Sequence, residues 1–259
     1  MSTIMLRCAS LAALVFAGLV AGSTNVKIAG KPVAYKLMYF DAKGAAEISR
    51  VLFKIGGLEF EDFRYPITQK EGGGFETLEY TEQKTAGTFA ANMDRVPLLS
   101  IDGELVGQSR AIERYVASTC SLMGCTDEER AKIDCVVENV RDVKEKWGKI
   151  RMQGGMGTNP EKDKLMEGWF AGGEFSEWLL KLEKSLPANT SDDIAVGSSL
   201  SYADVSVWHL LRDYFNDHAE EVRAAEKKAS CAKLSRIAQR VSELPAVQSW
   251  LADRPKTMF

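Results

Sequence analysis

The sequence predicts an α/β domain followed by an all-α domain, and two observations carry this fold class. From Ala34 to about residue 118, alternating strand patterns are interleaved with helical ones, whereas beyond Gly124 no strand pattern competes with long helical stretches. The chain has 259 residues, 45% hydrophobic and 27% charged, which is typical of a globular protein. At roughly 100–200 residues per domain, one large or two small domains fit this length.

The charge pattern and the histidine content exclude several classes of function. The net charge is −3 and no basic block stands out, so we expect no nucleic-acid binding, which needs clustered Lys and Arg. His209 and His218 are the only histidines and lie in no Cys/His cluster. We therefore expect no metal site and no Ser-His-Asp chemistry. Both histidines are predicted to lie on helix faces.

The first 23 residues predict a secretory signal peptide. Arg7 precedes an apolar run of about 14 residues, Cys8 to Ala21, which is short for a membrane span. The small residues Ala21-Gly22-Ser23 then suit signal peptidase. An uncleaved anchor and an organelle transit peptide are the alternatives. The prediction implies the secretory route, with the endoplasmic reticulum, a plastid reached by that route or secretion as destinations, and a mature chain without a stable membrane span.

A β-α-β unit opens the folded part of the chain, after a polar linker at residues 24–33. Ala34–Phe40 is rich in aromatics and predicts a strand, and Ala45–Ile55 has a helical period that ends at Gly56-Gly57. Leu58–Phe63 alternates and predicts a second strand. The two strands are expected to be parallel, with the helix as their crossover.

The next elements complete the first domain. Gln69–Asp94 is a long polar segment that we expect to be partly helical or mobile. Val96–Ile101 predicts a strand, Asp102-Gly103 a hairpin turn and Glu104–Gly107 the returning strand, and Ser109 then suits the N-cap of a helix. The order β-α-β-loop-β-β-α is that of a thioredoxin-like domain, which we place at residues 34–118.

The second domain is predicted to be all-α and to span residues 124–259. Thr126 to Glu129 resembles a capping box before a helix that continues to about Arg151, and a Gly-rich segment from Gly154 to Pro160 ends it. About five helices are expected in all, the others covering Lys162–Leu186, a stretch from Ser201, Leu234–Leu244 and Ala246–Leu251.

Tyr39 is the first candidate for chemistry. It lies at the end of the first strand, and ligands bind at the carboxyl ends of parallel strands in open α/β sheets. Its hydroxyl can donate one hydrogen bond. If the acceptor is a thiolate, the bond favours the charged form and lowers the pKa of that thiol below its usual value of about 8.5. The alternative is an ordinary strand aromatic in the core.

Two further segments could recognise a peptide. A cis Val96–Pro97 bond would turn the Val96 main chain outward, where it could pair with an extended peptide, and a trans bond is the alternative. Ser109 would bring free N–H groups and the positive end of a helix dipole together, which binds carboxylates, unless it is an ordinary N-cap. Together with Tyr39, these features suit a small acidic peptide with a thiol.

Several blocks of the sequence form a recognisable set. They are Tyr35-Lys36-Leu37-Met38-Tyr39-Phe40, Ala46-Glu47-Ile48 with Arg50, Arg95-Val96-Pro97-Leu98-Leu99, Gln108-Ser109-Arg110-Ala111-Ile112, Ser201-Tyr202-Ala203-Asp204 and Leu244 to Arg254-Pro255. Together these blocks resemble a glutathione transferase of the sigma class, which includes the glutathione-dependent prostaglandin D synthases and the S-crystallins. The resemblance runs from Ala34 to Phe259.

The resemblance implies an enzyme that joins the glutathione thiolate to hydrophobic electrophiles, as in detoxification, with glutathione as co-substrate, no metal, and a homodimer. Tyr39 would be the catalytic hydroxyl, Val96 would pair with the cysteinyl unit ahead of a cis Pro97, and Gln108 and Ser109 would hold the γ-glutamyl end. The implied glutathione-binding set is Tyr39, Phe40, Lys84 (with Tyr80 four residues earlier), Arg95, Val96, Pro97, Gln108 and Ser109.

Departures from the family pattern keep alternatives open. Ala45 stands where the family has an arginine that tunes the hydroxyl, which would weaken activation or move that task to Lys43. The partner's acidic residue at the glutathione amine would be Glu138 or Asp142. The alternatives are a non-catalytic glutathione binder like the S-crystallins and a glutathione-dependent isomerase.

The cysteines offer little to a redox function. A thioredoxin-like reductase would need a cysteine near the end of the first strand, and none lies between Cys8 and Cys120. Cys120 and Cys125 are expected to be idle thiols, with a disulfide as the alternative, and Cys135 is expected in the core.

Overall fold

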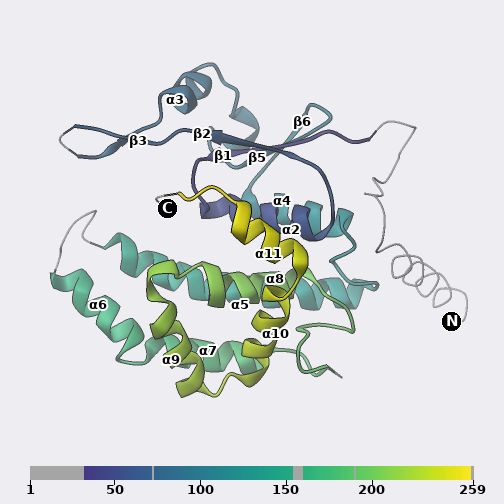
Figure 1. Ribbon diagram of the computed structural model, residues 1–259, viewed down its shortest axis with the longest axis vertical. Coiled ribbons are helices and arrows are strands. Elements are labelled where there is room, and N and C mark those ends of the chain that lie inside the picture. The colour runs from purple at the N-terminus through teal and green to yellow at the C-terminus, as the bar shows by residue number, and fades with distance from the viewer. Residues whose placement is uncertain (1–31, 72, 154–159, 190, 258–259) are drawn as a thin grey trace, which may run out of the picture.

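The computed structural model describes residues 32–71, 73–153, 160–189 and 191–257, and confirms the predicted fold class. A small sheet with its own helices lies against a larger group of helices (Figure 1). The predicted signal peptide, almost all of the linker and most of the Gly-rich segment after Arg151 lie outside the described residues, and the domain limits at 34–118 and 124–259 stay predictions.

Four strands form the main sheet in the order β2-β1-β5-β6. β1 is parallel to β2, as predicted, while β5 is antiparallel to both β1 and β6. The second strand begins three residues later than expected, because the Leu58 N–H still bonds to the Phe53 carbonyl and Leu58 is buried in the core. The strands are β1 (Tyr35–Phe40), β2 (Glu61–Tyr65), β5 (Leu98–Ile101) and β6 (Glu104–Gly107).

Two helices separate this sheet from the helical part, α2 (Glu47–Ile55) and α4 (Ser109–Thr119) (Figure 1). The described residues of the long polar segment lie on the other side of the sheet (Figure 1). They form the two-stranded β3 (Thr68–Gln69) and β4 (Phe75–Glu76), then α3 (Leu78–Thr85) and a 3-10 turn η2 (Ala90–Asn92). A second 3-10 turn, η1 (Gly44–Ala46), leads from β1 into α2.

The helical part has more helices among its described residues than the five expected. The stretch Lys162–Leu186 is two helices, because Gly173, at φ 94°, starts a new one. The helix Ala219–Ala229 was not predicted, although Val222, Ala225 and Ala229 are buried on one of its faces. The elements are α5 (Asp127–Met152), α6 (Pro160–Phe170), α7 (Glu174–Ser185), α8 (Tyr202–Trp208) with a π-helical turn η3 (His209–Asp213), η4 (Asn216–His218), α9 (Ala219–Ala229), α10 (Ala232–Ser242) and α11 (Pro245–Asp253).

Both predicted helix starts in this part are capped by side chains. The Thr126 hydroxyl accepts from the Glu129 N–H at 3.1 Å, and the Glu129 carboxylate reaches back to the Cys125 N–H at 2.7 Å. At α8 the fully buried Asp204 carboxylate accepts from the N–H groups of Ser201 and Ala195, both at 2.7 Å, and from the Ser201 hydroxyl at 2.6 Å. These bonds satisfy helix-end donors that burial would otherwise leave unpaired.

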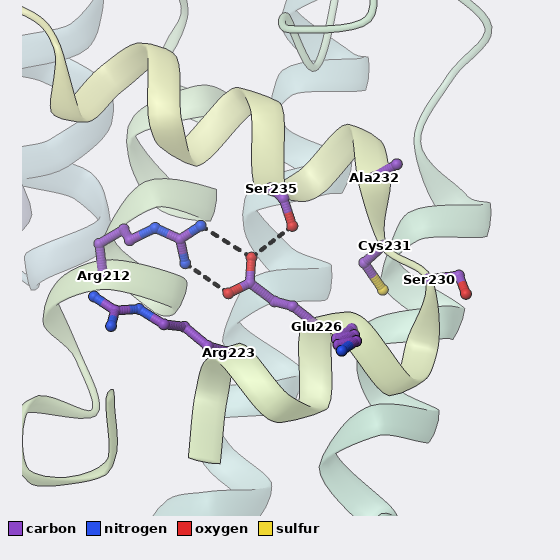
Figure 2. Close-up of a pocket in the computed structure, with 8 residues that line it drawn as sticks. Arg212, Arg223, Glu226, Ser230, Cys231, Ala232 and Ser235 are labelled. Atoms are coloured by element: carbon purple, nitrogen blue, oxygen red, sulfur yellow. Dashed lines mark hydrogen bonds and ion pairs between the residues drawn. The ribbon is translucent and has the colours of Figure 1, made fainter. Parts of the chain in front are cut away.

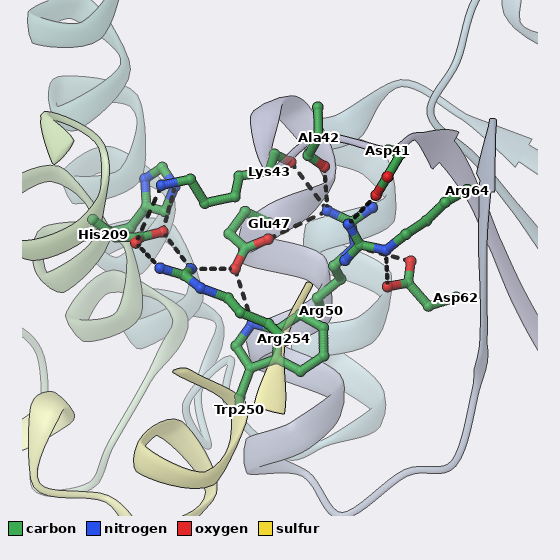
Figure 3. A network of polar contacts seen from close by, with 11 residues as sticks. Asp41, Ala42, Lys43, Glu47, Arg50, Asp62, Arg64, His209, Trp250 and Arg254 are labelled. Atoms are coloured by element: carbon green, nitrogen blue, oxygen red, sulfur yellow. Dashed lines mark hydrogen bonds and ion pairs between the residues drawn. The ribbon is translucent and has the colours of Figure 1, made fainter. Parts of the chain in front are cut away.

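A buried carboxylate, that of Glu47 in α2, joins the two parts of the chain (Figure 3). Its Oε1 accepts from Trp250 Nε1 at 2.8 Å and from Arg254 Nη1 at 2.7 Å, and its Oε2 lies 3.3 Å from Arg50 Nη1. Arg254 also contacts Asp213 through both terminal nitrogens, at 3.1 and 2.7 Å. The C-terminal helix is therefore held on α2 by charge-assisted hydrogen bonds as well as by apolar packing.

We expect Glu47→Gln to lower the free energy of unfolding by about 3–5 kcal/mol, the cost of breaking a buried ion pair from one side. The amide would turn an N–H₂ group toward donors and leave buried cations without their counter-charge. Urea unfolding followed by circular dichroism measures this change.

The matched control is Glu61→Gln, because Glu61 has an exposed side chain (58%) paired with Lys36 at 3.0 Å. Its effect should stay within about 1 kcal/mol. Equal losses for the two variants would contradict the assigned role of Glu47.

Candidate functional site

Strand register brings three of the predicted segments to one edge of the sheet. Met38 in β1 pairs with Leu98 in β5, so Val96, two residues before Leu98, lies at the level of Phe40. Leu98 in turn pairs with Gly107, the last residue of β6. The start of β5 and the turn into α4 therefore lie beside the carboxyl end of β1. This is the edge of the sheet at which the sequence predicted the site.

Tyr39 is half-buried at this edge, next to the start of the β1–α2 loop. Its hydroxyl lies against Gly44, where an added Cβ would be 2.6 Å from Tyr39 Oη, and Gly44 itself has φ +43°. Only glycine fits this position without displacing the phenol. Among the described residues, none hydrogen-bonds the Tyr39 hydroxyl, so this donor is available to a ligand.

The Val96–Pro97 peptide bond is cis, as the resemblance implied. Pro97 is buried and β5 begins at the next residue. Within the described part of the chain, no hydrogen bond occupies the N–H or the carbonyl of Val96. This main chain can therefore pair with an extended peptide, as an added strand would.

Asn92 is a site residue that sequence reasoning missed. Its buried side-chain amide donates to the carbonyls of Arg95 and Pro97, both at 3.0 Å, and its Oδ1 accepts from the Gln108 N–H at 3.1 Å. Gly107 is required beside it, because a Cβ there would lie 2.5 Å from Asn92 Cβ. One side chain thus holds the Val96–Pro97 segment and the Gln108 turn together. The buried amide gave no sequence signal, since Asn92 lies in a polar segment.

Gln108 and Ser109 occupy the turn into α4, and the N-cap lies one residue before its predicted position. Gln108, at φ 68°, is the N-cap residue, and Ser109 is the first residue of the helix, so the expected N-cap role of Ser109 is wrong by one position. Gln108 is exposed and Ser109 half-buried. The free N–H groups of the first turn still lie at this point, with the positive end of the helix dipole, and favour a carboxylate.

The remaining predicted residues surround the edge less closely. The Phe40 ring lies 4.8 Å from Tyr80 of α3, and the Tyr80 hydroxyl donates to the Asp94 carbonyl at 3.0 Å. Arg95 is exposed next to Val96. Lys84 is exposed in the last turn of α3, and no contact with the sheet edge places it in the site, so its role stays a prediction.

Because Ala45 replaces the family arginine, the sequence left open which cation lies near Tyr39, and the structure answers part of that question. Ala45 is exposed in η1, and Lys43 turns toward the helical part, where its Nζ lies 3.8 Å from Asp213. A different cation lies near Tyr39: the buried Arg50 guanidinium is 6.0 Å from the Tyr39 ring centroid. Arg50 donates to the Ala42 carbonyl at 2.7 Å and to the Lys43 carbonyl at 3.2 Å, and so shapes the loop that follows Tyr39 (Figure 3).

A second polar network is buried between α4, α5 and α8. The Lys144 ammonium lies 2.8 Å from His209 Nδ1, and burial lowers the pKa of both groups. Glu113, whose pKa is raised by burial, accepts hydrogen bonds from the Tyr202 hydroxyl and from Arg110 Nη1, the latter at 3.1 Å. His209 lies in the π-helical turn η3, and its side chain is buried in this network.

The cysteines do not contribute to the sheet edge. Cys120 and Cys125 are thiols and not a disulfide, as expected, and burial raises the pKa of Cys120 to about 12. Cys135 is exposed on α5, so its expected place in the core is wrong. Cys120 therefore lacks the low pKa that makes a cysteine reactive.

A separate hollow of about 400 Å³ lies between α9 and α10 (Figure 2). The Glu226 carboxylate inside it accepts from Arg212 at 2.7 and 3.0 Å and from the Ser235 hydroxyl at 2.7 Å. The N–H groups at the start of α10 are also taken, by Glu183. Its polar centre is thus satisfied by the protein's own groups.

The described residues contain no cluster of three or more His, Cys, Asp or Glu that could hold a metal ion. In the same residues no helix is both long and apolar enough to cross a membrane.

Comparisons with known proteins agree with this arrangement. A family model described as glutathione S-transferase, C-terminal domain, matches residues 141–254. Glutathione S-transferase 3 of Caenorhabditis elegans is 33% identical over 227 residues, which are 88% of this chain and 100% of that protein. Hematopoietic prostaglandin D synthase of Gallus gallus is 29% identical over 86% of this chain and 98% of its own length.

Solved structures extend the likeness to the fold. The crystal structure of a monomeric glutathione S-transferase from the hookworm Necator americanus is 25% identical, has a TM-score of 0.68, and covers 87% of this chain and 100% of its own. The chain therefore belongs to the glutathione S-transferase family.

Proposed function

We propose that the protein is a glutathione transferase that joins the glutathione sulfur to an electrophilic carbon of apolar substrates. One observation carries the proposal. The free hydroxyl of Tyr39, the unpaired main chain of Val96 and the start of α4 meet where β1 ends, and Asn92 holds the last two together. Family membership and the name of the Caenorhabditis elegans relative support it. Detoxification and passage into the secretory route stay predictions from the sequence.

Each group at the edge has a distinct task toward the tripeptide. The Val96 main chain pairs with the cysteinyl unit, and the start of α4, with Gln108 and Ser109, binds the γ-glutamyl carboxylate. The cysteinyl sulfur is thereby brought to Tyr39. Arg95 and Lys84 supply positive charge for the glycyl carboxylate.

Tyr39 stabilises the thiolate. Its O–H donates to the sulfur, which favours the charged form, and each unit by which the pKa of the thiol falls corresponds to about 1.4 kcal/mol. Two units turn a thiol that is only a few per cent ionised at neutral pH into one that is mostly ionised. The thiol proton leaves to solvent, and the sulfur forms its bond to carbon as the leaving group departs.

The sigma class and its neighbours are the finer part of the proposal. The Tyr35-to-Phe40 and Gln108-Ser109 blocks support sigma-class membership, and the Gallus gallus relative supports a glutathione-dependent isomerase as a variant of the same chemistry. Ala45, which replaces the family arginine, favours the second candidate, a non-catalytic glutathione binder.

Tyr39→Phe should lower kcat/KM toward 1-chloro-2,4-dinitrobenzene at least tenfold, because the thiolate loses its hydrogen bond, and should shift the activity profile to higher pH. Retention on immobilised glutathione should persist, since the phenol is only one of several contacts. Spectrophotometric assays across pH measure kcat/KM and the pH profile, and chromatography on immobilised glutathione measures retention.

Tyr35→Phe is the control, because Tyr35 lies at the opposite end of β1. Unchanged turnover in Tyr39→Phe would refute the role of Tyr39. Retention on glutathione without conjugation by the wild-type chain would favour the non-catalytic candidate.

Asn92→Ala should raise KM for glutathione about tenfold while kcat changes less, because Asn92 positions two binding segments and does not touch sulfur. Three hydrogen bonds of about 1 kcal/mol each are lost, and only part of that loss reaches the ligand. Steady-state kinetics with varied glutathione measure it.

The matched control is Asn139→Ala, whose amide donates at 3.1 Å to Ser185 in the helical part. If Asn92→Ala keeps the wild-type KM while its stability falls, Asn92 is only structural.

A homodimer is part of the proposal, although the hookworm relative is described as monomeric. Leu78, the first residue of α3, and Met93, next to Asn92, have exposed fractions of 66% and 76%, and we expect a partner to cover these two apolar side chains. Glu138, a candidate for the contact across the interface, is already held by Arg114 and Arg141 of its own chain, both at 2.6 Å.

Sedimentation equilibrium should therefore give twice the chain mass, and Leu78→Glu with Met93→Glu should give the single mass. A wild-type chain that sediments as a monomer at micromolar concentration would contradict this assembly.

A further inference from the structure

A second hollow, which we call the α6–α9 pocket, lies in the helical part and plays no role in the proposed transfer. The two helices are in contact and lie away from the sheet (Figure 1). The pocket has a volume of about 460 Å³, within the range of small-molecule sites. It is lined by Met166, Glu167, Phe170, Ala171, His218, Glu221 and Ala224.

The floor of the pocket is aromatic and firmly supported. The Phe170 and His218 rings have centroids 4.8 Å apart and are tilted by 33°. Beneath them, the buried Trp147 ring lies 5.3 Å from Phe170 and 5.7 Å from His218. A flat apolar ring system can therefore pack on this floor with little rearrangement, because the rings below are already held in place.

The rim of the pocket is acidic. α6 contributes Glu167 and α9 contributes Glu221, and the lining includes no Lys or Arg. Hydrogen bonds from its own backbone N–H and from His218, whose Nδ1 is 3.3 Å away, lower the pKa of Glu221 and keep it ionised. Within the described ranges, Glu167 has no ion-pair partner. The lining therefore combines one carboxylate from each helix with an aromatic surface.

We propose that the α6–α9 pocket binds a flat aromatic molecule that carries a protonated amine. The ring system packs on Phe170 and His218, and the ammonium lies between Glu167 and Glu221, where the face of Phe170 adds a cation–π attraction. An anionic aromatic would be repelled by the same rim. The site is independent of the transferase function, because it shares no residue with the sheet edge.

Isothermal titration calorimetry of the full chain with 1-naphthylmethylamine tests the proposal, with 1-naphthalenemethanol and 1-naphthoate as neutral and anionic probes of the same shape. We expect one site per chain for the amine, at least tenfold weaker binding of the alcohol and no binding of the carboxylate. Saturating S-hexylglutathione, which would fill the proposed transferase site, should leave the amine's affinity unchanged.

Glu167→Gln with Glu221→Gln should weaken amine binding about tenfold, and Ala224→Phe should abolish it by filling the pocket. Glu220→Gln is the matched control, because Glu220 is the exposed neighbour of Glu221 and does not line the pocket. Amine binding should persist in Tyr39→Phe, which separates this site from the proposed function. Absence of saturable binding, competition by S-hexylglutathione or equal affinity for the three probes would overturn the proposal.

Discussion

The carboxylate of Glu47 is the contact on which the arrangement of the two parts most depends. It lies at the start of α2, fully buried, and receives hydrogen bonds from Arg50 of its own helix and from Trp250 and Arg254 near the C-terminus. A buried charge without partners is costly, so this carboxylate is stable only when residues some two hundred positions away are docked. The same arginine at position 50 also holds the Ala42–Lys43 turn, so the interdomain contact and the loop after Tyr39 share one support.

Backbone pairing between strands, rather than any one side chain, brings most of the site's segments together. Antiparallel pairing on both sides of β5 places Val96 level with the end of β1 and beside the turn into α4. Asn92 then fixes the distance between the two segments with three hydrogen bonds. Such preorganisation matters because a short peptide ligand has few contacts with which to order mobile loops.

The helical part uses its polar residues in two ways. Between α4, α5 and α8, Lys144 is enclosed with His209, and Glu113 with Arg110 and Tyr202, which orients the helices at the cost of desolvation. Between α6 and α9, Glu167 and Glu221 line a pocket that also has aromatic rings and contains no Lys or Arg. The first arrangement is complete within the chain, whereas the second is suited to a cationic ligand.

Local pattern in the sequence was enough to determine the β-α-β opening, the Asp102-Gly103 hairpin and the long helix after Thr126, because periodicity, turn residues and caps act over a few positions. The candidate roles of Tyr39 and Val96 came from local pattern together with the family resemblance, and that of Gln108 came from the resemblance alone. It misplaced the start of the second strand and the N-cap at Ser109, since hydrogen bonds to Phe53 and φ at Gln108 decide those boundaries. Tertiary structure alone decided that Asn92 joins two binding segments, that Arg50 rather than Lys43 approaches Tyr39, and that His209 is buried. Those contacts link residues from different elements, and no short-range pattern encodes which buried partner a polar side chain will meet.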